Sequence, residues 1–297
     1  MLLATFDDDR VGLVAGQRIA DVTDEVRAVT GGTNGAMRGL IRDWPQVRPR
    51  LEGPEHRASL PLSAVRLGPP VPDPTKIVAA PVNYLDHMSE MSEEHHITSL
   101  GVFLKAPSAL VGPDGPIQLP YTDRRFDQEG ELAVVIGRRA RNVSVDAALD
   151  HVFGYTGLLD ITMRGGEDRS TRKSFDTFAP LGPWLVTGEE FGRPDNVDLT
   201  CRVNGRLRQE ANTRDLIWDV PALVSYVSSV MTLEPGDVIA TGTPAGVGPI
   251  SPGDDVELEL SGIGTLRVTV AADDAVTCPT TGAGRGPVPP PPPVETS

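Results

Sequence analysis

The sequence predicts a mostly β protein of the α+β class, and three features carry that prediction. Residues 199–209 (LTCRVNGRLRQ) place an Asn-Gly turn between two short runs, which is the pattern of a β-hairpin. Residues 256–260 and 266–270 alternate apolar and polar side chains with the period of two that half-buried strands show. Residues 132–136 (LAVVI) form a short apolar run that a glycine ends, as in a buried strand.

The chain is expected to divide into three regions. Residues 1–70 are expected to form a small N-terminal β-rich domain with two short strands and one short helix within residues 35–43. A Pro-rich stretch at 68–74 separates it from a larger domain, expected at residues 75–271, whose one long apolar stripe at helical spacing follows a cap at Asp219. From residue 272 the composition becomes Gly- and Pro-rich, which predicts a disordered tail over residues 272–297.

Composition narrows the expected partners and compartment. The chain has 297 residues and a formal net charge of −14, which argues against nucleic acid as a partner. No apolar run is long enough to span a membrane, and residues 1–6 are too short and lack the basic start of a signal peptide. Cys201 and Cys278 lie far apart and suggest neither a disulfide framework nor a zinc site, so we expect a reducing, cytoplasmic location.

Two carboxylates lie at the start of the apolar strand. Glu129 and Glu131 are two residues apart, so on a strand they point to the same face, and Gly130 adds no side chain between them. Like charges held together there are costly unless a cation balances them, and Mg²⁺ or Mn²⁺ prefers such oxygen ligands. The alternative is an exposed strand end with two solvated glutamates.

Three other residues are candidates for chemistry. His87 and Glu90 are spaced so that a helix brings them together, and a carboxylate beside a histidine raises its basicity, as a general base requires. The alternative is an incidental ion pair on a surface helix. Asp160 lies in an apolar run and needs a partner, which is either a metal ion or a base such as Arg164.

Two polar segments complete the candidates. Lys173 begins a segment rich in aromatic residues, Pro and Gly and can direct a positive charge into a cleft, although a solvated lysine is the plain alternative. Residues 241–248 (TGTPAGVG) offer backbone N–H groups and hydroxyls that suit a carboxylate or a phosphate. This loop is not a P-loop, because no Gly-Lys-Ser/Thr follows it.

Taken in order, these segments resemble the fumarylacetoacetate hydrolase family over about residues 75–270, and the N-terminal unit resembles that of the family's bacterial members. The matching motifs are Asn83-Tyr84 with His87, residues 129–132 (EGEL), residues 154–160 (GYTGLLD), residues 173–178 (KSFDTF) and residues 241–244 (TGTP). The resemblance implies a mixed β-sandwich roll, a homodimer and one Mg²⁺ or Mn²⁺ held by three carboxylates.

The resemblance also assigns roles to residues of this chain. It implies that the metal ligands are Glu129, Glu131 and Asp160, and that the catalytic residues are His87, Glu90 and Lys173. It places a further set against a small 2-oxo acid substrate: Tyr84, Arg164, Glu167, Gly242 and Thr243. The sequence departs from the family pattern at Pro81, where relatives have glycine, and at residues 163–167 (MRGGE), where Glu167 replaces a neutral amide.

The resemblance implies a hydrolase that cleaves a C–C bond in a 2,4-dioxo acid of the acylpyruvate or fumarylpyruvate type through a metal-stabilised pyruvate enolate. A decarboxylase of oxaloacetate-type acids or an isomerase of 2-hydroxymuconate-type dienols can use the same site. A metal-binding or interaction protein without catalysis, acting through the Pro-rich tail, is the alternative outside enzymes.

Overall fold

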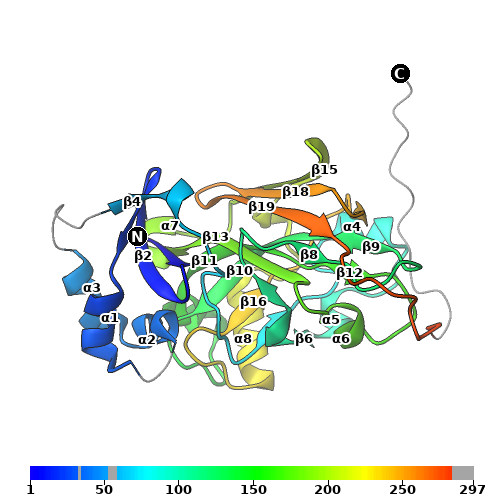
Figure 1. Ribbon diagram of the computed structural model, residues 1–297. Coiled ribbons are helices and arrows are strands. Elements are labelled where there is room, and N and C mark those ends of the chain that lie inside the picture. Colours follow the sequence, from blue (N-terminus) through cyan, green and yellow to red (C-terminus); the bar gives the residue numbers. More distant parts are fainter. Residues whose placement is uncertain (33–34, 53–58, 283–297) are drawn as a thin grey trace.

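The computed structural model describes residues 1–32, 35–52 and 59–282, and its main feature within these residues is an 11-stranded sheet (Figure 1). Hydrogen-bonded neighbours follow the order β4-β3-β2-β1-β13-β11-β10-β16-β5-β6, and β7 pairs with β13. The strands are β1 (Leu2–Phe6), β2 (Arg10–Ala15), β3 (Arg18–Asp21), β4 (Ser59–Pro61), β5 (Ile77–Ala79), β6 (Phe103–Lys105), β7 (Leu110–Val111), β10 (Gly130–Ile136), β11 (Val152–Leu159), β13 (Ala179–Thr187) and β16 (Val238–Ala240).

A second sheet packs on one face of the first. Its order is β15-β14-β18-β19-β8, with β8 (Ile117–Gln118), β14 (Asp198–Val203), β15 (Arg206–Asn212), β18 (Asp255–Leu260) and β19 (Gly264–Ala271). A Cβ on Gly130 would lie 2.8 Å from Leu258 Cδ1. The absence of a side chain at Gly130 therefore lets the two sheets approach closely at this point. The predicted hairpin is β14–β15, and the predicted mostly β class is confirmed.

A third, small sheet follows the order β12-β9-β17, with β9 (Phe126–Gln128), β12 (Thr162–Met163) and β17 (Gly248–Pro249). It is formed by the segments that flank Glu129 and Asp160 and by the loop after residue 246. The expected strand that begins at Glu129 and Glu131 starts at Gly130 in the structure, and Glu129 lies where the chain passes from the small sheet to the main one.

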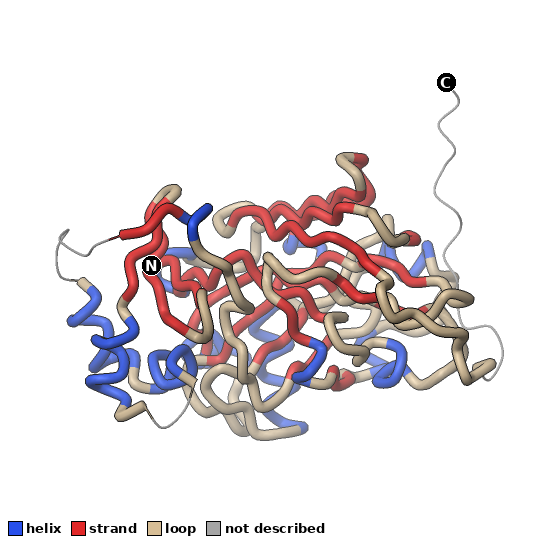
Figure 2. The backbone as a smooth tube through the Cα atoms, viewed as in Figure 1, coloured by secondary structure: helices blue, strands red, loops and turns tan. Residues whose placement is uncertain are grey.

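Most helices of the described residues, but not α4 (Leu85–Glu90) or α7 (Gly188–Phe191), cover the main sheet on the face opposite β18 and β19 (Figures 1 and 2). The longest of them, α8 (Val220–Val230), begins at Asp219, whose side chain accepts the Ala222 N–H at 2.9 Å, and it buries the predicted apolar stripe. The other helices are α1 (Thr23–Thr30), α2 (Ala36–Arg42), α3 (Trp44–Leu51), α4 (Leu85–Glu90), α5 (Ile97–Leu100), α6 (Arg169–Arg172) and α7 (Gly188–Phe191), with 3₁₀ turns η1 (Leu62–Ala64), η2 (Pro107–Ala109), η3 (Val145–His151) and η4 (Thr213–Asp215). No helix in the described ranges is long and apolar enough to cross a membrane.

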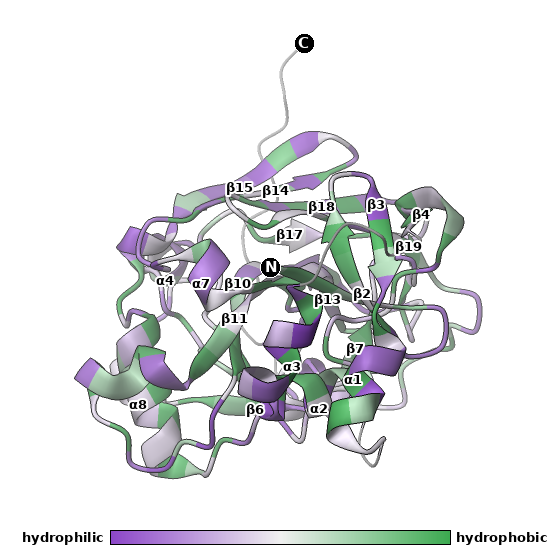
Figure 3. Ribbon diagram, turned by 90° about the vertical axis from the view of Figure 1, so that its left-hand side faces the viewer, coloured by the Kyte–Doolittle hydropathy of each residue, from purple (hydrophilic) through white to green (hydrophobic). Residues whose placement is uncertain are grey.

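The N-terminal region joins the main sheet. Its strand β1 pairs antiparallel with β13, and α1–α3 pack beside the strands (Figure 3). Apolar side chains of both regions, including Val135 and Phe153, share one cluster. The region thus holds three helices besides the expected strands. The domain boundary near residue 70 stays a prediction.

The segment after β19 differs from the expected disordered tail. Residues 272–282 are described and lie along residues 118–124: the Val276 N–H donates to the Pro120 carbonyl, and the Thr122 N–H donates to the Val276 carbonyl, both at 3.0 Å. The Gly- and Pro-rich composition from residue 272 gave no sign of these backbone contacts, because backbone hydrogen bonds do not depend on apolar side chains. The Pro-rich run lies in residues 283–297, outside the described residues.

Candidate active site

Three buried carboxylates lie at the junction of β10 and β11. Glu129, Glu131 and Asp160 each offer an oxygen, and these oxygens all lie within 4.8 Å of one another. Strand alternation brings the two glutamates to one face, and the antiparallel pairing of Gly130 with Leu159 brings Asp160 beside them. The Asp160 N–H donates to the Glu129 carbonyl at 2.8 Å, which fixes this register.

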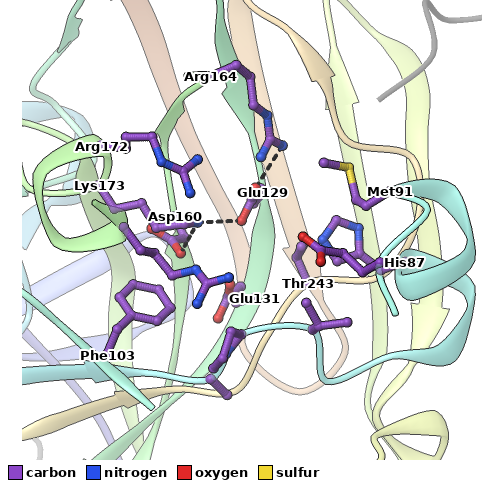
Figure 4. Close-up of a pocket in the computed structure, with 15 residues that line it drawn as sticks. His87, Met91, Phe103, Glu129, Glu131, Asp160, Arg164, Arg172, Lys173 and Thr243 are labelled. Carbon is purple, nitrogen blue, oxygen red and sulfur yellow. Dashed lines mark hydrogen bonds and ion pairs between the residues drawn. The ribbon is translucent and has the colours of Figure 1, made fainter. Parts of the chain in front are cut away.

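Two lysines contact Asp160, and Figure 4 shows one of them, Lys173. Lys173 donates from Nζ to Glu129 Oε2 at 2.7 Å, to Asp160 Oδ2 at 2.5 Å and to the hydroxyl of Thr162 at 2.7 Å. Lys105 donates to Asp160 Oδ1 at 2.6 Å and also contacts the Lys173 carbonyl. Asp160 therefore lies within the carboxylate cluster and also forms ion pairs, although its partners are lysines rather than Arg164.

Arg164 balances the other side of the cluster. It donates from Nη2 to Glu129 Oε1 at 2.9 Å and from Nε to Asp127 Oδ2 at 2.7 Å. Among the described residues, no lysine or arginine forms an ion pair with Glu131, whose Oε2 accepts the Gly242 N–H at 2.7 Å. Glu131 is thus the least compensated carboxylate of the three.

The surroundings of Glu129 and Glu131 shift the pKa values of these two carboxyl groups in opposite directions. Burial opposes ionisation of Glu129, but the nearby Lys173 and Arg164 prevail and lower its pKa below the ordinary carboxyl value. Burial, followed by the charge of Asp160, raises the pKa of Glu131 well above that value. Three oxygen donors, one without a cationic partner, fit a hard divalent ion such as Mg²⁺ or Mn²⁺.

His87 lies across the pocket from the cluster (Figure 4), and Glu90, outside the pocket lining, pairs with it. His87 and Glu90 are both on α4, and His87 Nδ1 lies 3.1 Å from Glu90 Oε2. The other oxygen of Glu90 accepts the Gly246 N–H at 2.9 Å, so the carboxylate is held at both ends. A carboxylate partner keeps the proton on Nδ1, which leaves Nε2 to accept a proton.

The pocket also contains cations that the sequence reasoning missed. Arg169 and Arg172 of α6 line it, and the Arg169 Cζ lies 5.6 Å from the centroid of the Phe103 ring. Burial, together with the charges of Arg164 and Arg169, lowers the pKa of Arg172. Arg169 and Arg172 lie three residues apart beside Lys173, and this spacing on a helix is the signal that points to a shared face.

Two more residues that carry the site escaped the sequence reasoning. Lys105 is buried in the apolar strand β6, where a lysine requires an anionic partner, and that is its signal. Gln209 of β15 is fully buried, accepts the Gly130 N–H at 2.8 Å and donates to the Thr243 hydroxyl at 2.7 Å. No sequence pattern marks Gln209, because a glutamine in a hairpin is ordinary.

The structure places some of the predicted substrate-binding residues at the pocket and others away from it. Arg164 and Thr243 line the pocket, although the Thr243 hydroxyl also donates to the Gly130 carbonyl at 3.0 Å. Gly242 touches the cluster through its N–H. Tyr84 is buried and does not line the pocket, and burial, with a contribution from the charge of Glu131, raises its pKa.

The two departures from the family pattern lie in different places. Glu167 lies outside the pocket lining and pairs with Arg124, whose Nη2 is 2.6 Å from each carboxylate oxygen. Pro81 lines the pocket and is followed by Val82 at φ 46°, a left-handed backbone conformation that β-branched residues rarely adopt.

The family model described as "Fumarylacetoacetate (FAA) hydrolase C-terminal" matches residues 76–271. A maleylpyruvate hydrolase of Aquipseudomonas alcaligenes is 42% identical over 285 residues, which cover 91% of this chain and 99% of that protein. A crystal structure of maleylpyruvate hydrolase from Sphingobium sp. SYK-6, in complex with manganese(II) ion and pyruvate, matches with a TM-score of 0.82 at 42% identity, covering 92% of this chain and 99% of the other.

A more distant relative is a mitochondrial oxaloacetate tautomerase, fahd2, of Xenopus laevis, 38% identical over 217 residues that cover 69% of this chain and 68% of that protein. The matched region contains all three carboxylates, the His87–Glu90 pair and Lys173. The chain belongs to the fumarylacetoacetate hydrolase family, and its fold is that of the family's solved structures.

Proposed function

We propose that the protein is a divalent-metal-dependent hydrolase that cleaves a C–C bond in a 2,4-dioxo acid of the acylpyruvate type. The observation that carries this proposal is the opposition, across one pocket, of a carboxylate cluster fit for a hard cation and a histidine held by a carboxylate. The similarity to maleylpyruvate hydrolases over nearly the whole chain supports the same reaction.

The metal would be held by Glu129, Glu131 and Asp160. When bound, the cation supplies a Lewis acid and a template for the 2-oxo acid end of the substrate. Lys173 and Lys105 keep the Asp160 carboxylate in position through their hydrogen bonds. The Gly242 N–H does the same for Glu131, and the burial of the carboxylates limits the access of bulk water to them.

His87 would act as the general base. Its Nε2 takes a proton from a water molecule, and Glu90 stabilises the imidazolium that results. The water oxygen bonds to C4 of the substrate, the C3–C4 bond breaks, and its electron pair passes into the pyruvate fragment, which then takes up a proton at C3. A carboxylic acid and pyruvate are the products.

The two α6 arginines favour a substrate with a second negative charge at its distal end. Arg172 donates from Nε to the Glu167 carbonyl at 2.9 Å, and among the described residues it forms no ion pair with a carboxylate. Its remaining N–H groups can bind a carboxylate in bidentate fashion. Fumarylpyruvate or maleylpyruvate should therefore be a better substrate than acetylpyruvate.

The test is a turnover screen with metal removal. Protein stripped with EDTA and reloaded with Mg²⁺ or Mn²⁺ should convert maleylpyruvate or fumarylpyruvate to pyruvate, with acetylpyruvate slower and stripped protein inactive. Enolisation or decarboxylation of oxaloacetate without any hydrolysis would instead favour the tautomerase or decarboxylase alternative, which the similarity to fahd2 supports.

We also propose a homodimer in the cytoplasm. Large apolar side chains at Leu85 and Leu104 are 63% and 46% exposed, and a second copy could cover them. The two cysteines are free, which suits a reducing compartment. Light scattering after size-exclusion chromatography should give twice the 31.6 kDa chain mass; a monomer mass would contradict the dimer.

A further inference from the structure

A network outside the pocket ties the arginine-bearing segment to the C-terminal segment. Arg124 donates from Nη2 to both oxygens of Glu167 at 2.6 Å and from Nη1 to the carbonyl of Thr280 at 2.8 Å. The hydroxyl of Thr280 donates to Glu167 Oε1 at 2.7 Å. We call Arg124, Glu167 and Thr280 the clamp.

The backbone on both sides holds the clamp closed. The Cys278 N–H donates to Asp123 Oδ1 at 2.8 Å, which places Thr280 beside Arg124. On the other side, a Cβ on Gly165 would lie 2.3 Å from the Arg124 guanidinium and 2.3 Å from Glu167 Oε2. Gly165 therefore leaves room for these two charged groups, whose ends would have to shift if a Cβ were present.

The clamp lowers the pKa of Glu167, since the Thr280 hydroxyl and Arg124 outweigh the opposing effect of burial. The side chains of Arg124 and Glu167 are 12% and 9% exposed, so solvent screens this ion pair less than one on the open surface. Glu167 is thus a carboxylate whose charge is already matched.

The backbone of Glu167 also contacts Arg172, one of the cations that line the pocket. Its carbonyl accepts the Nε–H of Arg172, so its carboxylate needs a side-chain rotation, rather than a movement of the backbone, to approach the same guanidinium. A carboxylate free of the clamp would compete with an anionic substrate for Arg172. With the clamp closed, the Arg172 guanidinium remains available.

We propose that the clamp withholds Glu167 from Arg172 and thereby sets the preference of the pocket for 2-oxo acids that carry a distal carboxylate. This proposal rests on the proposed function and states its substrate class more narrowly. Arg124, Glu167 and Thr280 are positioning residues, because they act on the substrate through Arg172.

The test measures binding to Mn²⁺-loaded full-length protein by calorimetry with two probes, 2-oxoglutarate, which has a distal carboxylate, and pyruvate, which has none. Arg124→Gln should weaken 2-oxoglutarate binding about ten-fold, the equivalent of one ion pair lost, and leave pyruvate binding unchanged. Arg124→Gln combined with Glu167→Gln should recover 2-oxoglutarate binding, because the freed side chain is then neutral. Thr280→Val should also weaken 2-oxoglutarate binding, by a smaller factor than Arg124→Gln.

Two results would overturn the clamp: a double variant as weak as Arg124→Gln, which would make Arg124 a brace for the fold, or a wild-type protein that binds the two probes equally. Thermal unfolding checks that each variant is folded, and Thr280→Val provides a milder change if Arg124→Gln is not. A separate result would contradict the proposed function: a wild-type protein that binds 2-oxoglutarate more tightly than pyruvate but hydrolyses no acylpyruvate.

Discussion

The two sides of the pocket are built in different ways. The carboxylate cluster lies on β10 and at the end of β11, in the middle of the main sheet, and its members are at most 4% exposed. The arginines that face it lie on α6, a helix of four residues, in a segment held by side chains from residues 124 and 280. The carboxylates proposed to hold the metal are thus placed beside strands of the main sheet, and the arginines proposed to select the substrate are placed on a segment that other parts of the chain position.

This difference has a physical basis. A sheet fixes the direction of a side chain through alternation and register, both of which many backbone hydrogen bonds enforce. A short helix has few internal bonds and takes its position from tertiary contacts. Changes in the cluster should therefore abolish activity, and changes around α6 should alter the choice of substrate.

The largest effect should follow from removing a proposed metal ligand. Asp160→Asn should weaken Mn²⁺ binding by more than about 100-fold and abolish turnover, because it removes one of three anionic oxygens. Calorimetric titration of stripped protein with Mn²⁺ measures this. Asp127→Asn is the matched control, since Asp127 is a buried neighbour that pairs with Arg164 but lies outside the cluster. Equal Mn²⁺ affinity in Asp160→Asn and the wild type would refute the ligand assignment.

A smaller effect should follow on α4, which carries His87 across the pocket from the cluster and forms a wall distinct from α6. His87→Gln should lower kcat roughly 100- to 10,000-fold, the range for loss of a general base, and leave Mn²⁺ affinity intact. Glu90→Gln should lower kcat less, since the imidazole remains and loses the stabilisation of its charge. Unchanged kcat in His87→Gln would exclude it as the base, and the separation of kcat from metal affinity would distinguish the cluster from the α4 wall.

The fold and the cluster could be predicted because their signals are local. The hairpin at Asn204-Gly205, the cap at Asp219 and the alternation of Glu129 and Glu131 each depend on neighbours in sequence. The family motifs added Asp160, which lies about thirty residues further along and meets the glutamates through strand pairing.

What escaped prediction depends on contacts between distant segments. Gln209 reaches Gly130 across 79 positions, and Arg124 meets Thr280 across 156. Glu167 was expected beside the substrate because it replaces a neutral amide of the family pattern. The structure instead gives its carboxylate to Arg124, a partner that no local pattern indicates.

The smallest effect should separate the cluster from the α4 wall through a pair of buried glutamines. Gln209 holds Gly130, between the two ligating glutamates, and Gln128 holds the loop at Gly246 by accepting the Gly248 N–H and donating to the Gly246 carbonyl, both at 3.0 Å. Each change to leucine leaves a buried N–H unpaired, at a cost of about 1–3 kcal/mol in the free energy of unfolding.

Their functional effects should differ. Gln209→Leu should weaken Mn²⁺ binding about 10-fold, because the metal ligands on either side of Gly130 lose their support. Gln128→Leu should leave Mn²⁺ binding unchanged and lower kcat, because Gly246 is the residue whose N–H holds Glu90 beside His87. Titration with Mn²⁺ and steady-state kinetics on both variants measure the two effects. If both variants lost metal affinity equally, the cluster and the α4 wall would form one unit, and the contrast between them would not hold.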